Sequence, residues 1–136
     1  MDLQKIIPLI ARTCLAVIFL RSGAGKVLDF AGTQEQIAGA GLPLAALMTV
    51  GAIVFELVGA VLVLLGYKAK WGALLLILFL IPTTLLFHTN FAEGMQVTQF
   101  FKNLAILGGL LMVTAFGSGP LSLENRFRSR RRFGGM

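Results

Sequence analysis

Four apolar runs, each long enough to cross a lipid bilayer, constrain the fold of this 136-residue chain more than any other feature. A helix needs about 20 apolar residues to span the hydrocarbon core, and none of the runs alternates as a membrane β-strand would. Hydrophobic residues make up 57% of the sequence and charged residues 13%, which excludes an ordinary soluble domain. The sequence therefore predicts an all-α integral membrane protein, an antiparallel bundle of four transmembrane helices. We expect spans at about 6–27, 44–66, 71–90 and 100–118 within a domain of residues 1–118, followed by a basic tail at 119–136.

The distribution of basic residues predicts the orientation of the bundle. Lys5 precedes the first span, Lys68 and Lys70 lie in the tight turn between the second and third, and the arginines follow the fourth. Cytoplasmic loops carry the excess of Lys and Arg. Both termini are therefore expected in the cytoplasm, with Tyr67 and Trp71 at the membrane interface.

The formal net charge of +6 belongs largely to the tail, which holds five of the twelve basic residues: Arg126, Arg128, Arg130, Arg131 and Arg132. A basic cluster directly after a hydrophobic helix fits the anionic headgroups of the cytoplasmic leaflet. We therefore expect contact with membrane lipids and no binding of nucleic acid.

The connections on the opposite side of the membrane are longer than the Lys68–Lys70 turn. Residues 28–43 include a segment, Thr33–Ala38, that fits a short amphipathic helix ending before Gly41, Leu42 and Pro43. Residues 89–98 form the second connection, and the two together are expected to close that end of the bundle.

Glu56 is the most informative single residue, because it interrupts an apolar run that is otherwise without charge. A carboxylate at membrane depth is costly and is usually paired, turned inward and functional. Helical periodicity puts Glu56 on one face with Thr49, Gly59, Ala60 and Val63, whose mostly small side chains let a neighbouring helix approach closely. We therefore expect Glu56 to face the interior.

In the first span, Arg12, Ala16, Phe19, Gly23 and Lys26 share a stripe, with Arg21 pointing away from it. Depth along the helices favours Arg12 as the partner of Glu56. His88, Lys102 and Asn103 lie nearer the opposite surface with Lys26. The sequence predicts one intramembrane polar cluster made of Arg12, Lys26, Glu56, His88, Lys102 and Asn103.

Each of these residues also has a structural interpretation. Arg12 and Glu56 as a pair can hold two helices together without further function, His88 can cap a helix, and Lys102 can extend to the interface. One cysteine, Cys14, excludes an intrachain disulfide and a dithiol reaction. One histidine with no second histidine or cysteine nearby makes a poor metal site, so no metal is expected.

The order of these landmarks resembles the DoxX family of small four-helix bacterial membrane proteins. The resemblance covers nearly the whole chain, from Arg12 through the Glu56 run to Lys102 and Asn103 and a closing Gly117–Glu124 segment. Further landmarks are Phe19, Ser22, Gly23 and Lys26, then Gly41, Leu42 and Pro43, then Leu57, Gly59, Gly66 and His88. Glu124 stands where an aspartate is expected, and the arginine-rich tail extends past the usual end. The resemblance implies a multi-pass protein of the inner membrane, and relatives with links to quinone-dependent oxidation of thiosulfate and to membrane redox complexes.

Two principal functions remain open from the sequence, which defines no reaction. The first is a subunit of a membrane redox assembly that binds quinone or a small sulfur oxyanion in the polar cluster. Since no cofactor motif is present, such a subunit would take its redox chemistry from quinone or a partner. The second is a non-catalytic accessory or assembly subunit that docks onto a larger membrane complex or onto copies of itself. A transporter or channel is a third and weaker alternative, because four spans without an inverted repeat leave little room for alternating access.

Overall fold

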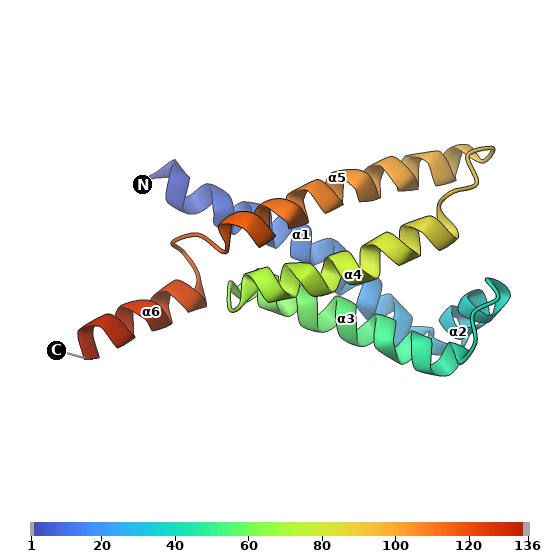
Figure 1. Ribbon diagram of the computed structural model, residues 1–136, viewed down its shortest axis with the longest axis horizontal. Coiled ribbons are helices and arrows are strands. Elements are labelled where there is room, and N and C mark those ends of the chain that lie inside the picture. The colour runs from blue at the N-terminus through green and yellow to red at the C-terminus, as the bar shows by residue number, and fades with distance from the viewer. Residues whose placement is uncertain (1, 135–136) are drawn as a thin grey trace.

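The computed structural model describes residues 2–134 and folds them into six helices (Figure 1). Four of these helices are long and apolar enough to cross a membrane, which confirms the predicted four-helix bundle. The six helices are α1 (Leu3–Leu28), α2 (Phe30–Gly39), α3 (Ala45–Leu65), α4 (Ala69–Phe87), α5 (Gly94–Phe116) and α6 (Leu123–Gly134), with α1, α3, α4 and α5 as the candidate spans.

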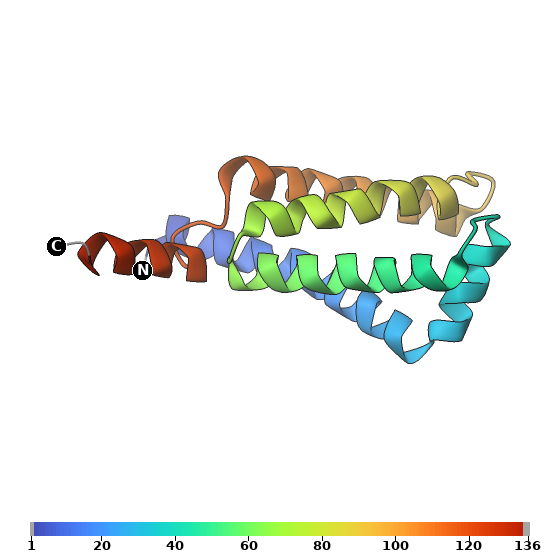
Figure 2. The ribbon, with the colours of Figure 1, turned by 60° about the horizontal axis from the view of Figure 1, so that its bottom comes forward.

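The short α2 lies between the first two spans, as the sequence predicts. The Asp29 side chain accepts a hydrogen bond from the Gly32 amide at 3.1 Å and so caps the start of α2. Ile37 is its buried residue, and Gly41, with φ +84°, takes the left-handed conformation that ends the segment. The helix therefore crosses one end of the bundle and connects α1 with α3 (Figure 2).

The spans pack in the order α1, α3, α4, α5. The contacts of α1 with α3, of α3 with α4 and of α4 with α5 are extensive, whereas α1 and α5 meet over a short stretch. One such meeting point is Gly109, where an added Cβ would lie 2.9 Å from Cδ2 of Leu15. From there α1 and α5 diverge toward the end that holds α2, as both ribbon views show (Figures 1 and 2). The bundle is thus closed at one end and spread open at the other.

The interface between α3 and α4 depends on two glycines that bring the backbones together. An added Cβ at Gly59 would lie 2.9 Å from the carbonyl oxygen of Gly72 and 2.8 Å from Cγ of Leu76. An added Cβ at Gly72 would meet the carbonyl oxygen of Gly59 at 2.9 Å. Small residues at such contacts let membrane helices pack closely.

Replacing Gly59 by alanine is expected to destabilise the protein by about 1–3 kcal/mol, because the backbone of α4 must move away. Gly51 in the same helix provides the matched control, since its added Cβ would meet nothing within 4 Å. Gly51→Ala is expected to leave stability unchanged or slightly raised. Thermal unfolding of both variants in detergent measures the difference. Equal behaviour of the two would contradict the close approach.

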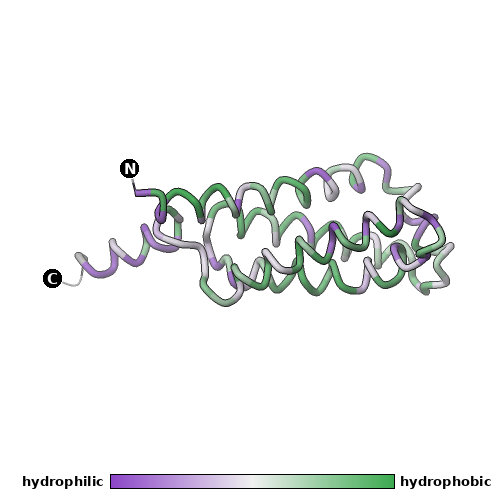
Figure 3. The backbone as a smooth tube through the Cα atoms, turned by 90° about the horizontal axis from the view of Figure 1, so that it is seen from above, coloured by the Kyte–Doolittle hydropathy of each residue, from purple (hydrophilic) through white to green (hydrophobic). Residues whose placement is uncertain are grey.

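Both termini lie at the same end of the bundle, opposite α2 (Figure 1). This arrangement follows from four antiparallel spans, and the cytoplasmic placement of that end stays a prediction from the basic residues. Within the predicted tail, Leu123–Gly134 form the helix α6, which points away from the bundle and carries hydrophilic residues (Figures 1 and 3). The last two tail residues lie outside the described part of the chain.

The helix α5 begins six residues before the start expected for the fourth span. Its N-terminal residues Gly94–Thr98 fall within the connection that the sequence predicts at residues 89–98. Helix and hydrocarbon-spanning segment need not coincide, and the polar first turns of α5 extend the helix past the apolar run.

Candidate binding site

A cavity of about 820 Å³ lies where α1 and α5 diverge, at the α2 end of the bundle. Its lining combines polar and apolar side chains from α1, α2, α3, α4 and α5. Of the six residues predicted to cluster, the structure places five around this cavity: Lys26, Glu56, His88, Lys102 and Asn103. Arg12 lies elsewhere.

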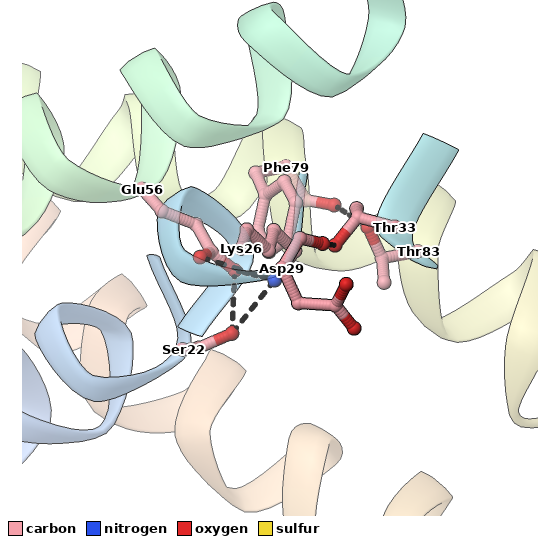
Figure 4. Close-up of polar contacts among 7 residues, drawn as sticks. All are labelled: Ser22, Lys26, Asp29, Thr33, Glu56, Phe79 and Thr83. Carbon is pink, nitrogen blue, oxygen red and sulfur yellow. Dashed lines mark hydrogen bonds and ion pairs between the residues drawn. The ribbon is translucent and has the colours of Figure 1, made fainter. Parts of the chain in front are cut away.

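Glu56 is held by two groups of α1. Its side chain is 1% exposed, and its Oε1 accepts hydrogen bonds from Lys26 Nζ and Ser22 Oγ, both at 3.0 Å. Lys26 Nζ also donates to Glu56 Oε2 at 3.2 Å and to Ser22 Oγ at 2.8 Å (Figure 4). The buried carboxylate is therefore both charge-paired and hydrogen-bonded, which is the condition for keeping a charge inside a membrane bundle.

Lys26 lines the cavity together with Glu56, the residue with which it is paired. Its side chain is 22% exposed, and Nζ is 5.2 Å from the ring centroid of Phe79 on α4 (Figure 4). A cation over an aromatic ring is stabilised by the negative face of the ring. Lys26 is thus oriented from two sides and still reaches the cavity.

Close packing of α1 on α3 explains why Ser22 and Lys26 reach Glu56. An added Cβ at Gly23 would lie 2.6 Å from Cδ2 of Leu57 and 3.4 Å from Oε2 of Glu56. Gly23 therefore brings the backbone of α1 against α3 at the level of the carboxylate. Ser22 and Lys26 are four residues apart and so lie one turn apart on the same side of α1.

On the other side of the cavity, α4 and α5 are joined by a buried polar contact. Asn103 Nδ2 donates to Thr84 Oγ1 at 2.9 Å, and Thr84 Oγ1 donates to the Leu80 carbonyl at 2.7 Å. Both side chains are at most 8% exposed. Asn103 therefore fixes the position of α5, while its neighbour Lys102 remains exposed at the cavity.

His88 ends α4, where its amide donates to the Thr84 carbonyl at 3.0 Å. The ring lines the cavity, yet its Nδ1 is buried and has no hydrogen-bond partner in the described chain. A buried polar atom without a partner costs free energy. A ligand that draws the imidazole into the cavity would give this atom a partner.

The predicted pairing of Arg12 with Glu56 is wrong. Arg12 is 2% exposed, but its guanidinium donates to the carbonyl of Val63 at 3.3 Å and to the carbonyl of Leu121. The side chain thus holds the C-terminal end of α3 and the segment before α6, at the closed end of the bundle. The error lies in the vertical register of the helices, since Arg12 is level with the end of α3 whereas Gly23 is level with Glu56.

Sequence reasoning did not name Ser22 as a site residue. Its hydroxyl is a direct partner of both charged groups. The available signal was its position one turn before Lys26, beside the inward stripe. Thr33 and Gln36 of α2 also line the cavity, and only the folded position of α2 reveals this.

These features define a class: a small four-helix membrane protein with a cavity of mixed polar and apolar lining at one end of the bundle. The family model named DoxX matches residues 7–89, and the chain belongs to the DoxX family. Two relatives from Escherichia coli match over almost their whole length. The inner membrane protein YqjF is 36% identical over 122 residues, covering 90% of this chain and 92% of the relative. The inner membrane protein YphA is 32% identical over 128 residues, covering 90% of this chain and 91% of the relative.

A more distant match is the yeast ER-derived vesicles protein ERV29, which is 32% identical over 79 residues. That match covers 54% of this chain and 26% of the relative. No solved structure matches the chain significantly. The family, the four candidate spans and the bacterial relatives identify a multi-pass protein of the inner membrane.

Proposed function

We propose that this protein is a small subunit of a membrane redox assembly and that it binds a quinone headgroup in the cavity between α1 and α5. The observation that carries the proposal is the mixed lining of the cavity, in which hydrogen-bonding groups face apolar walls. Lys26, His88 and Lys102 supply donors, and Phe19, Phe79, Leu80 and Ile106 supply apolar surface. A quinone ring with two carbonyl oxygens matches both kinds of surface.

The size and position of the cavity favour quinone over a small sulfur oxyanion. A volume of about 820 Å³ lies in the range of sites for organic ligands and far exceeds the needs of a tetrahedral anion. Helices α1 and α5 both line the cavity and diverge there (Figure 2), and we propose that an isoprenoid tail leaves the cavity between them. A free oxyanion would gain nothing from such a route.

The redox chemistry would come from the quinone and from a partner protein. The sequence has one cysteine and one histidine, and the described residues contain no group of three or more potential metal ligands. Electron transfer to a quinone carbonyl is accompanied by proton uptake. Lys26, Glu56 and Ser22 form a hydrogen-bonded chain beside the cavity that is suited to hold a proton.

Photolabelling in nanodiscs with an azido-quinone tests the binding site. We expect labels on residues that line the cavity. In the double variant Lys102→Gln, His88→Ala, labelling by the azido-quinone should decrease about tenfold or more, since each lost hydrogen bond costs about 1 kcal/mol. Arg21→Gln is the control, because Arg21 is an exposed basic residue of α1 outside the cavity lining. Equal labelling of the double variant and of the Arg21→Gln control would contradict the proposal. Displacement of the azido-quinone by millimolar thiosulfate would favour binding of the oxyanion.

Co-purification tests the partner. Gentle extraction followed by mass spectrometry is expected to recover an electron-transfer protein, and the recovered assembly should reduce quinone with thiosulfate or sulfite as donor. A stable complex that retains its partner but does not label with quinone would instead support the accessory-subunit function.

A further inference from the structure

A second cavity, of about 400 Å³, lies at the closed end of the bundle, at the opposite end of the spans from the first. It is formed by the turn between α3 and α4, the C-terminal end of α5 and the first turns of α6. The residues that matter for its chemistry are Lys68, Lys70, Trp71, Phe116, Ser118 and Arg128. None of them belongs to the candidate quinone site.

The charge of this cavity is predominantly positive. Lys68, Lys70 and Arg128 line it, together with one acid, Glu124, whose carboxylate is 3.8 Å from the guanidinium of Arg128. Lys68 and Lys70 form no ion pair within the described residues. The cavity also lies at the N-terminal end of α4, where no side chain caps the helix and the helix dipole favours an anion.

A serine hydroxyl adds a hydrogen-bonding group to this positive cavity. Ser118 lines the cavity, although the residue as a whole is only 7% exposed. Its hydroxyl forms no hydrogen bond to another described residue, so it is available to donate to a phosphate oxygen in the cavity.

The rim of the cavity is apolar and faces outward. Trp71 is 67% exposed and Phe116 is 77% exposed, although both are large aromatic residues. Tryptophan is enriched at the membrane interface, where headgroups meet acyl chains. The cavity therefore matches a ligand with an anionic head and apolar chains.

From these observations we infer that this cavity is a binding site for the phosphate of an anionic glycerophospholipid. Lys68, Lys70 and Arg128 surround the headgroup, Ser118 donates to a phosphate oxygen, and Trp71 and Phe116 contact the acyl chains. The site differs from general attraction of the arginine-rich α6 to the membrane, because it requires residues of the α3–α4 turn. Its occupation would hold α6 and the end of α5 against the turn.

Trp71 is the single tryptophan of the chain and reports directly on this site. In neutral detergent micelles, brominated phosphatidylglycerol and brominated phosphatidylcholine are titrated against the full-length protein, and quenching of Trp71 fluorescence gives the affinity for each. We expect phosphatidylglycerol to bind at least about tenfold more tightly. In the triple variant Lys68→Gln, Lys70→Gln, Arg128→Gln this preference should fall to about twofold or less, since each basic group near a lipid surface contributes about a factor of five.

The matched control removes the same charge from the exposed part of α6, as Arg130→Gln, Arg131→Gln, Arg132→Gln, and should retain the preference. Equal loss in both triple variants would overturn the proposal in favour of general electrostatic attraction. Inorganic phosphate at millimolar concentration separates the two phosphate sources. Full relief of quenching by phosphate would overturn the lipid assignment, because it would identify a site for the free ion, whereas persistence of quenching supports the lipid.

Discussion

Replacing Lys26 by methionine is expected to lower the free energy of unfolding by about 3 kcal/mol, because it leaves a buried carboxylate without its counter-charge. Glu56 is 1% exposed and would keep only the Ser22 hydroxyl as a partner. Methionine preserves most of the volume of the lysine stem, so lost packing contributes little. Unfolding by titration with a denaturing detergent, followed by circular dichroism, measures the change.

A double variant separates the free-energy cost of leaving Glu56 without a counter-charge from the stabilisation that the Lys26–Glu56 ion pair provides. The double variant Lys26→Met, Glu56→Leu removes both charges and is expected to recover most of the lost stability. Arg21→Met is the control for loss of a basic residue from α1, since Arg21 is exposed and unfolding should be unchanged. If the double variant were as unstable as the single one, the ion pair would not be what stabilises this region.

Replacing Arg12 by leucine is expected to destabilise the closed end of the bundle by about 2–3 kcal/mol, because the carbonyl of Leu121 loses its donor and a gap opens in the core. The guanidinium of Arg12 packs tightly against Gly66, which ends α3 with φ +67°. The Gly66 carbonyl in turn accepts a hydrogen bond from the Glu124 amide at 3.1 Å. Loss of Arg12 should therefore free the segment before α6.

Hydrogen exchange gives the specific measurement for this region. Protection of the Glu124 amide should fall in Arg12→Leu and persist in Arg21→Leu, which removes an exposed arginine of the same helix. Arg12→Lys should behave like the leucine variant, since one ammonium cannot reproduce the planar, two-carbonyl geometry of the guanidinium. Unchanged protection in Arg12→Leu would show that the segment is held by other contacts.

Helical periodicity was sufficient to predict which faces point inward. The stripe of Arg12, Ala16, Phe19 and Gly23 is buried in α1, and Arg21 is exposed. The face of α3 that carries Glu56 is buried as expected. These predictions hold because an α-helix fixes the angular position of each residue, whatever its neighbours are.

The vertical register between helices could not be predicted in the same way. Placing Arg12 level with Glu56 assumed that the first two spans begin and end at matching depths. In the structure α1 is longer than α3, and Arg12 reaches Val63 near the end of α3. That offset depends on the close contact at Gly23 and on the path of the chain through α2 from α1 to α3. Both are tertiary features that helical periodicity in the sequence does not indicate.

The two inward-facing basic residues of α1 differ in how far along the chain their partners lie. Lys26 pairs with a residue 30 positions away, whereas Arg12 donates to a carbonyl 109 positions away. During synthesis, Lys26 can form its ion pair with Glu56 once α3 has entered the membrane. Arg12 can donate to the Val63 carbonyl at that stage, but its second acceptor, the carbonyl of Leu121, follows only after all four spans. Completion of the closed end is therefore a late step of biogenesis, and a chain that stops before Leu121 leaves this arginine without one of its two acceptors.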